Sequence, residues 1–245
     1  MIEVSVITPT YQRRPFIPAL IKIYQQQTYP KEKMEWIILD DGRDKVEDLF
    51  KEAAKTIPNL RYLYHPEKLR IGEKRNRLNQ EAKGQIIVAI DDDDFYPPNR
   101  VQSVVNAFAK HPHIDLAGSS KMYMYYMDTK KIYSIGPNGP THTTNGTMAY
   151  RKRYANQHSY DPHVTKGEEV SFLENYRHPL IQLDPLSSIV VICHTDNTVD
   201  KTKLRKEHEQ SNHPNRMALT NYQLYDFVSD PWLQDFYKQL PILLE

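Results

Sequence analysis

The sequence predicts an α/β protein with a doubly wound, mostly parallel central sheet flanked by helices and a smaller β-containing half. Strand and helix patterns alternate over roughly the first 118 residues, which is typical of parallel strands joined by crossover helices. Several of these strands are continuous apolar runs, as expected for strands that are buried on both faces. After Gly118 the alternation stops, and short strand patterns with polar turns follow.

The first half is expected to hold four strands joined by helices. The strands are predicted at residues 4–7, 36–39, 61–64 and 85–90. The first helix carries apolar residues at helical spacing from Phe16 to Tyr24, and Pro15 suits its first turn. Similar spacing predicts helices over residues 46–57 and 101–108, and residues 73–83 read as a helix that Gly84 closes.

The second half is expected to be richer in strands. Strands are predicted at residues 123–127, 132–135, 147–151 and 189–193, a helix at 168–176, and terminal helices within 219–244. The stretch from 195 to about 216 is polar and charged, which predicts a mobile loop or lid. We therefore expect one domain with a nucleotide-binding half (1–118), an acceptor and catalytic half (119–195), and a polar loop with C-terminal helices (196–245).

Composition excludes several classes of protein. Hydrophobic residues make up 39% and charged residues 26% of the 245 residues, as in soluble globular proteins. A net charge of +1 argues against nucleic-acid binding by phosphate neutralisation. The sequence has no apolar run long enough for a transmembrane segment and no signal-peptide pattern. The single cysteine, Cys193, excludes an intrachain disulfide and favours a reducing, cytoplasmic location.

Four consecutive aspartates, residues 91–94, follow the apolar strand at 85–90. Adjacent carboxylates repel one another, and a divalent cation such as Mg²⁺ or Mn²⁺ relieves that repulsion. In open α/β sheets, ligands bind at the carboxyl ends of the strands, where residues 8–10 and 40–41 are also expected. The pattern therefore indicates a metal and phosphate site. A solvated acidic turn that begins the next helix is the alternative interpretation.

Three motifs in this order resemble the family 2 glycosyltransferases, which have the GT-A fold. They are residues 4–11 (VSVITPTY), 38–42 (ILDDG) and 84–94 (GQIIVAIDDDD). The resemblance continues more weakly at residues 145–151, 160–162 and 167–169, and it covers roughly residues 2–195.

The resemblance implies a binding site for a nucleotide sugar. Its residues would be Thr8, Pro9, Tyr11, Arg13, Asp41, Arg70, Lys74, Asp91, Asp92 and Asp93. Asp91 and Asp93 match the acid-x-acid pair of the family, and Asp92 would lie near the ribose. Asp93 would hold Mn²⁺ or Mg²⁺ against the donor diphosphate. His194, which follows the late strand, is a candidate second metal ligand or a structural histidine.

The resemblance also implies the reaction and its base. Family members usually have a Glu-Asp pair where this chain has Glu168 and Glu169, so Glu169 matches the usual base and Glu168 is the second candidate. The same pair would also suit an acidic helix N-terminus. The implied reaction is a metal-dependent, inverting transfer from a nucleotide diphosphate sugar, most commonly a UDP-sugar in this family, to a hydroxyl of a glycan-type acceptor.

Other functions remain open at this point. A sugar-nucleotide nucleotidyltransferase would need a glycine-rich loop after the first strand, and residues 8–13 contain no glycine. A phosphatase with an aspartyl nucleophile would have its acidic pair after the first strand, whereas this chain has it after a later one. A catalytically inactive nucleotide- or carbohydrate-binding module is the remaining alternative, because glutamate replaces the usual aspartate at position 169.

Overall fold

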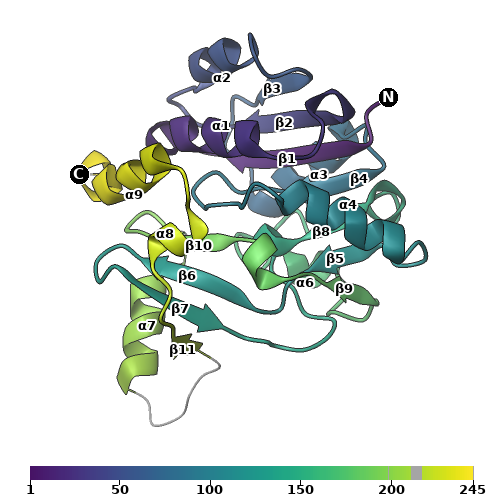
Figure 1. The fold of residues 1–245 in the computed structure, drawn as a ribbon. Coiled ribbons are helices and arrows are strands. Elements are labelled where there is room, and N and C mark those ends of the chain that lie inside the picture. The colour runs from purple at the N-terminus through teal and green to yellow at the C-terminus, as the bar shows by residue number, and fades with distance from the viewer. Residues whose placement is uncertain (198, 211–216, 245) are drawn as a thin grey trace.

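The computed structural model describes residues 1–197, 199–210 and 217–244, which build two β-sheets with helices around them (Figure 1). The larger sheet has seven strands in the order β3-β2-β1-β4-β8-β5-β9, and the smaller has four in the order β10-β6-β7-β11. The expected α/β class with a mostly parallel sheet is confirmed.

The first half of the chain forms the parallel part of the larger sheet. Its strands are β1 (Val4–Thr10), β2 (Met34–Asp40), β3 (Leu60–Tyr64) and β4 (Ile86–Ala89). β1 pairs in parallel with both β2 and β4, and β2 pairs in parallel with β3. Every residue of β1 and β2 is buried, which explains their continuous apolar runs.

Four helices connect or follow these strands. They are α1 (Ile17–Gln26), which follows the 3₁₀ turn η1 (Arg14–Phe16), α2 (Glu47–Ala53), α3 (Ile71–Glu81) and α4 (Arg100–Lys110). The crossovers bring the carboxyl ends of β1, β2 and β4 to one edge of the sheet, because all three strands run in the same direction.

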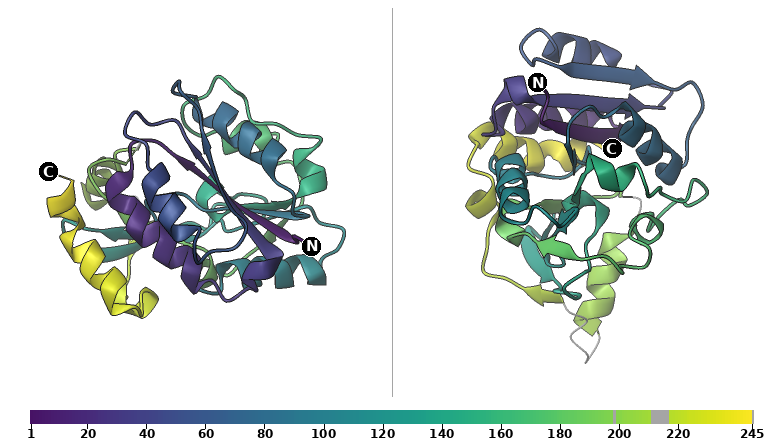
Figure 2. Two further views of the ribbon diagram at one scale, coloured as in Figure 1. Left: turned by 90° about the horizontal axis from the view of Figure 1, so that it is seen from above. Right: turned by 90° about the vertical axis from the view of Figure 1, so that its right-hand side faces the viewer.

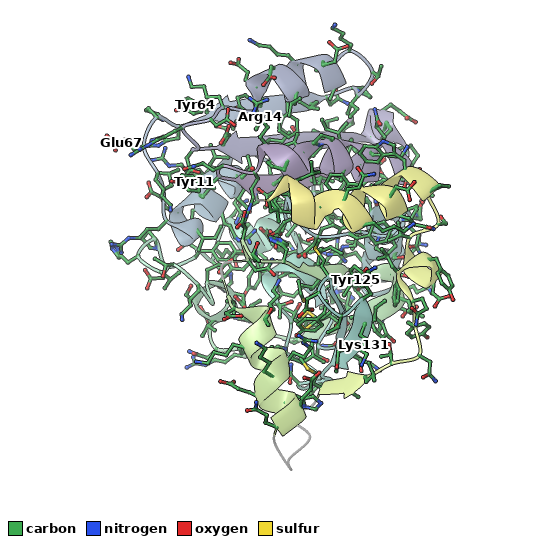
Figure 3. The ribbon with its side chains drawn as sticks, turned by 90° about the vertical axis from the view of Figure 1, so that its left-hand side faces the viewer. Tyr11, Arg14, Tyr64, Glu67, Tyr125 and Lys131 are labelled. Atoms are coloured by element: carbon green, nitrogen blue, oxygen red, sulfur yellow. The ribbon has the colours of Figure 1, made fainter. Side chains whose placement is uncertain are left out.

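The second half completes this sheet and adds the smaller one. β8 (Ala149–Arg151) runs antiparallel to both β4 and β5 (Leu116–Gly118), and β9 (Leu180–Gln182) pairs in parallel with β5. The smaller sheet contains β6 (Met122–Tyr126), β7 (Lys131–Ile135), β10 (Val190–Cys193) and β11 (Met217–Leu219). Tyr125 and Lys131 mark this lower part of the molecule in Figure 3, and Tyr11 and Tyr64 mark the upper part.

The acidic segment after β4 lies where the two sheets meet. Phe95, which directly follows the four aspartates, forms an antiparallel bridge with Val190 of β10. Its amide donates to the Val190 carbonyl at 3.0 Å, and the Val190 amide donates back at 2.8 Å. The aspartates are therefore held between β4 of one sheet and β10 of the other.

Two expected elements differ in the structure. The helix predicted over residues 168–176 ends early as α6 (Glu169–Phe172), because Glu174, Asn175 and Tyr176 all adopt left-handed φ values of 46–61°. Part of the predicted polar loop is helical: α7 covers Lys201–Gln210. Residues 198 and 211–216 of that loop lie outside the described part of the chain.

The expected terminal helices form and return to the first half of the chain. α8 (Leu224–Phe227) precedes α9 (Pro231–Leu243), and α9 lies beside α1 in the views of Figures 1 and 2. Asp230, at the start of α9, accepts from Gln26 at 2.6 Å and pairs with Lys22 at 3.1 Å. Leu233 and Leu240 of α9 belong to the main core. Among the described residues, none of the helices is both long enough and apolar enough to cross a membrane.

Candidate functional site

A cleft of about 580 Å³ opens at the carboxyl ends of the parallel strands. It is lined by Pro9, Thr10, Tyr11, Arg13, Lys68, Leu69, Arg70, Ile71, Lys74, Arg75, Asp91, Asp92, Asp93, Asp94, Thr165, Lys166, Gly167, Glu168, Asn197, Val199 and Lys201. The lining contains all four aspartates and several cations from different segments. Its position agrees with the expected edge of the sheet, and the mixture of charges suits a polar, anionic ligand.

Two of the four aspartates hold the fold together as well as lining the cleft. Asp91 pairs with the Arg75 guanidinium at 3.0 Å. Asp94 accepts from the backbone amide of Ile192 in β10 at 2.9 Å. Burial raises the pKa of both carboxyls, and the negative charge of Asp93 raises them further.

The middle two aspartates face the cations of the cleft. Arg13 lies 3.7 Å from Asp92 and 3.5 Å from Asp93. Burial and the neighbouring charge of Asp93 raise the pKa of Asp92 to about 7. Burial would also raise the pKa of Asp93, but the hydrogen bond from His194 and the charges of Lys201 and Arg13 lower it to about 2. Asp93 is therefore the carboxylate of this group that stays ionised most readily.

The structure brings the two predicted metal ligands together. The His194 Nε2 lies 3.2 Å from the Asp93 carboxylate, and the side chain of His194 is only 1% exposed. Asn197 contacts the same nitrogen at 2.8 Å. A carboxylate beside an imidazole, within a group of acidic side chains, is a donor set that suits Mn²⁺ and accepts Mg²⁺. The residues present thus fit a divalent cation, which would balance the surplus negative charge.

Arg75 connects the acidic segment to the predicted base residues. Its Nη2 pairs with Asp91 at 3.0 Å and its Nε pairs with Glu168 at 2.8 Å, with all of Arg75 only 4% exposed. Glu168 is therefore occupied by an ion pair. Glu169 is half-buried, and among the described residues it forms no ion pair. Burial and the charge of Glu168 raise the pKa of Glu169.

Replacing Arg75 with methionine should destabilise the protein by about 3–5 kcal/mol, because the buried Glu168 and the half-buried Asp91 lose their common partner. Urea unfolding followed by circular dichroism would measure the difference. The matched control is Arg77→Met on the same helix, where Arg77 pairs with Glu73 at the surface, and we expect a loss of no more than about 0.5 kcal/mol there. Equal losses in the two variants would contradict a structural role for the Arg75 bridge.

Lys74 and Asp41 form a second buried ion pair at the side of the cleft. Lys74 donates to the Asp41 carboxylate and to the Thr10 carbonyl, the latter at 2.9 Å. The other oxygen of Asp41 accepts from the Leu69 amide at 2.7 Å. Asp41 does not line the cleft but fixes two segments that do. Burial lowers the pKa of Lys74.

Of the remaining residues predicted to bind the nucleotide sugar, all but Thr8 line the cleft. Pro9, Tyr11 and Arg13 line the cleft, whereas the buried Thr8 side chain accepts from the Trp36 indole at 3.0 Å and points into the core. Arg70 lies on the rim, where it donates to the His163 carbonyl at 2.7 Å. Tyr11 lies in the upper part of the view in Figure 3, below Tyr64.

Sequence reasoning did not assign Lys68, Lys166 or Asn197 to the site, although all three line the cleft. Lys68 lies 4.1 Å above the Tyr11 ring. These residues come from loops, where the sequence offers no periodicity, so only their nearness to the motifs could have suggested them. In the polar stretch after His194, Lys201 lines the cleft, whereas Arg205 pairs with Asp128 at 2.5 Å beside the smaller sheet.

Several known proteins resemble this chain in sequence. A family model described as glycosyl transferase family 2 matches residues 5–165. An uncharacterized glycosyltransferase of Haemophilus influenzae is 29% identical over 111 residues, which cover 45% of this chain and 36% of that protein. The poly(ribitol-phosphate) β-N-acetylglucosaminyltransferase TarS of Staphylococcus aureus is 26% identical over 117 residues, or 47% of this chain and 20% of TarS. The chain thus matches well under half the length of these curated relatives.

Solved structures share the fold over most of the chain. The mannosyltransferase PcManGT from Pyrobaculum calidifontis, in complex with GDP-Man and Mn²⁺, has a TM-score of 0.64 at 18% identity, covering 80% of this chain and 58% of PcManGT. TarS with UDP-GlcNAc has a TM-score of 0.62 at 17% identity, covering 80% of this chain and 60% of the TarS chain. The architecture is therefore that of the GT-A glycosyltransferases. Because the family model covers more than half of the 245 residues, this chain belongs to glycosyl transferase family 2.

Proposed function

We propose that the cleft transfers a sugar, with inversion, from a nucleotide diphosphate sugar to a hydroxyl of a glycan-type acceptor. The observation that carries the proposal is the Arg75 bridge, which sets Glu168, and with it the adjacent Glu169, at a fixed place beside the acidic segment. This arrangement supports the proposal, because Glu168 lines the cleft and Glu169, the proposed proton acceptor, is its neighbour in the chain, although Glu169 is not itself a lining residue. Nucleotide sugars are bound by the two structural neighbours, as GDP-Man and UDP-GlcNAc.

The cations and the tyrosine of the cleft would bind the donor. Tyr11 would offer an aromatic face to the base, and Lys68, which contacts the Tyr11 ring, and Arg70 also line the cleft. Lys201, at the start of α7, faces the acidic end, where it would contact the diphosphate. We propose UDP as the nucleotide.

Asp93 and His194 would hold Mn²⁺ or Mg²⁺, which supplies positive charge to the leaving diphosphate. The chain itself keeps Asp93 ionised through His194, Lys201 and Arg13. Arg13 also approaches Asp92, so it restrains both carboxylates. These contacts orient the acidic segment before any donor binds, which lowers the cost of ordering it later.

Glu169 would act as the general base. Glu168 is neutralised by Arg75, whereas Glu169 has no cationic partner among the described residues and can accept a proton from an acceptor hydroxyl. Its raised pKa makes it a stronger base than an exposed glutamate. Glu169 therefore takes the catalytic role, and Glu168 positions the segment.

Turnover separates this proposal from an inactive binding module. Purified protein would be incubated with Mn²⁺ and UDP-glucose, UDP-N-acetylglucosamine or GDP-mannose, and the released nucleotide measured with and without a panel of oligosaccharide acceptors. Acceptor-dependent release supports the transfer reaction. Tight nucleotide binding without release from any of these donors would instead indicate a binding module of this fold.

The transfer rate should fall as the pH is lowered. Glu169 must be deprotonated to accept a proton, and burial raises its pKa above the ordinary value of 4.5. Activity is therefore expected to be complete well above this pKa and to be lost as the pH falls through it. The pH profile of kcat/KM would show a midpoint above 4.5. A rate that stays constant down to pH 4.5 would contradict the assignment of Glu169 as the base.

A further inference from the structure

A second group of potential ligands lies apart from the cleft. His158, Glu174 and His178 each offer one donor atom, and these atoms all lie within 4.8 Å of one another. The Glu174 carboxylate is 3.7 Å from the Nε2 of His158 and 3.2 Å from the Nε2 of His178. None of the three residues lines the cleft.

The backbone fixes which nitrogen of His158 is available. The Nδ1 of His158 lies 3.0 Å from the Tyr154 carbonyl oxygen. Because a carbonyl can only accept, Nδ1 carries the proton, and in the neutral ring the lone pair remains on Nε2, which faces Glu174. Metal-binding histidines are commonly oriented by this kind of hydrogen bond from their second nitrogen to a backbone carbonyl.

One tyrosine holds both imidazole rings in place. The Tyr154 ring stacks on His158 with centroids 3.9 Å apart and an interplanar angle of 10°, and it meets His178 edge-on at 5.4 Å. The Tyr154 hydroxyl donates to the Phe172 carbonyl at 2.9 Å, which fixes the tyrosine in turn. The two histidines are therefore oriented by packing before any ion binds.

The turn that carries Glu174 supports the same arrangement. Glu174, Asn175 and Tyr176 adopt left-handed conformations in succession, although none is glycine. Such conformations are unfavourable for side-chain-bearing residues and recur at ligand-holding sites. The turn brings the Glu174 side chain back towards His158, which precedes it by 16 residues in the chain.

We propose that His158, Glu174 and His178 bind a zinc-like transition-metal ion, with water as the fourth ligand. Two imidazoles and one carboxylate suit Zn²⁺, whereas Mg²⁺ and Ca²⁺ prefer oxygen ligands alone. Ligand atoms in a tetrahedral zinc site lie roughly 3.3 Å apart, so a small closure of the two histidines completes the shell. The side chains are 16%, 49% and 32% exposed, which leaves an entry path for the ion.

The ion would link His158 and His178, the two ends of the segment that contains Glu168 and Glu169. Residues 158–178 contain Glu168 and Glu169, and Phe172 within this segment stacks on Tyr160 at 4.2 Å. A metal that binds the folded state alone stabilises it by an amount that grows with the logarithm of the metal concentration above Kd. The proposal does not depend on the transfer reaction, because it concerns ligands outside the cleft.

Cobalt provides a direct test, since tetrahedral Co²⁺ absorbs visible light much more strongly than octahedral Co²⁺. Untagged, chelator-treated protein would be titrated with Co²⁺ and then with Zn²⁺, and thermal unfolding would be followed with and without Zn²⁺. We expect one equivalent of tetrahedral Co²⁺, displacement by Zn²⁺, and a higher Tm with Zn²⁺. Loss of the absorption in His158→Gln and in His178→Gln would support the site.

Two further variants make the result specific. His113→Gln replaces an exposed histidine elsewhere and should bind Co²⁺ like the wild type. Asp93→Ala should also retain the absorption, because Asp93 belongs to the cleft. Loss of the signal in Asp93→Ala, or its survival in a folded His178→Gln protein, would overturn the proposal. Absence of tetrahedral Co²⁺ from the wild type would show that the three residues form a hydrogen-bonded cluster only. If a histidine variant fails to fold, Glu174→Gln serves in its place with the same expected loss.

Discussion

Asp93→Ala should abolish Mn²⁺-dependent binding of the nucleotide while the protein remains folded. Asp93 is the most readily ionised of the four aspartates and lies 3.2 Å from His194. Removal of residues that only support a metal ligand costs roughly 10- to 100-fold in metal affinity, so we expect a larger loss here. Calorimetric titration with UDP and with GDP, each with and without Mn²⁺, would measure it.

The fold should tolerate this change, because Asp93 adds negative charge to an already acidic segment. Its charge raises the pKa of Asp92 and of Asp94, so alanine relieves repulsion there. Asp44→Ala, which removes an exposed carboxylate that pairs with Arg14, is the control and should bind like the wild type. Unchanged Mn²⁺-dependent binding in Asp93→Ala would exclude Asp93 from the metal site.

Glu169→Gln should leave donor binding intact and reduce transfer by about 10²- to 10⁴-fold, the usual contribution of a general base. The substitution keeps the size of the side chain and removes its ability to accept the proton. Rapid-quench measurement of sugar transfer, combined with calorimetric measurement of the nucleotide Kd, would separate the two effects.

Two variants would sharpen this result. Glu169→Asp should retain part of the activity, because it keeps a carboxylate and restores the residue that family members usually have. Glu168→Gln should also lower activity, but its ion pair with Arg75 predicts a loss of stability that Glu169→Gln does not share. Near-normal turnover in Glu169→Gln would rule out this residue as the base.

Much of the first half of the chain, residues 1–118, could be predicted from the sequence because its signals are local. Buried parallel strands produce continuous apolar runs, and the residues that follow them must lie at one edge of the sheet. This reasoning places residues 91–94, Pro9 and Thr10 at the edge where the cleft lies, whereas Tyr11 and Arg13 were implied only by the family resemblance. The direction of a strand depends on which distant strands it pairs with, and the residues of the strand itself do not reveal it. The sequence therefore did not show that β8 runs antiparallel to β4 and β5.

The contacts that organise the site were harder to predict because they join distant segments. Arg75 and Glu168 are 93 residues apart, and Asp93 and His194 are 101 apart. The pattern of charges in residues 195–216 indicated a loop, yet α7 forms within it and Arg205 pairs with Asp128. For Thr8 the sequence motif was misleading. The motif suggested that the Thr8 side chain contacts the ligand, but its hydroxyl accepts a hydrogen bond from the Trp36 indole instead.

The hydrogen bond from Ile192 to Asp94 has a consequence for the choice of metal. Together with the Phe95–Val190 bridge, it fixes the register of β10 against the acidic segment, so the residue presented to Asp93 is His194 and not its neighbour Cys193. A slip of one residue would exchange an imidazole for a thiol, because side chains alternate along a strand. Thiolates favour soft ions such as Zn²⁺ and Cu⁺ over Mn²⁺. The contacts that set this register, among them a hydrogen bond between residues 98 positions apart, would thus determine whether the proposed ligand set is hard or soft.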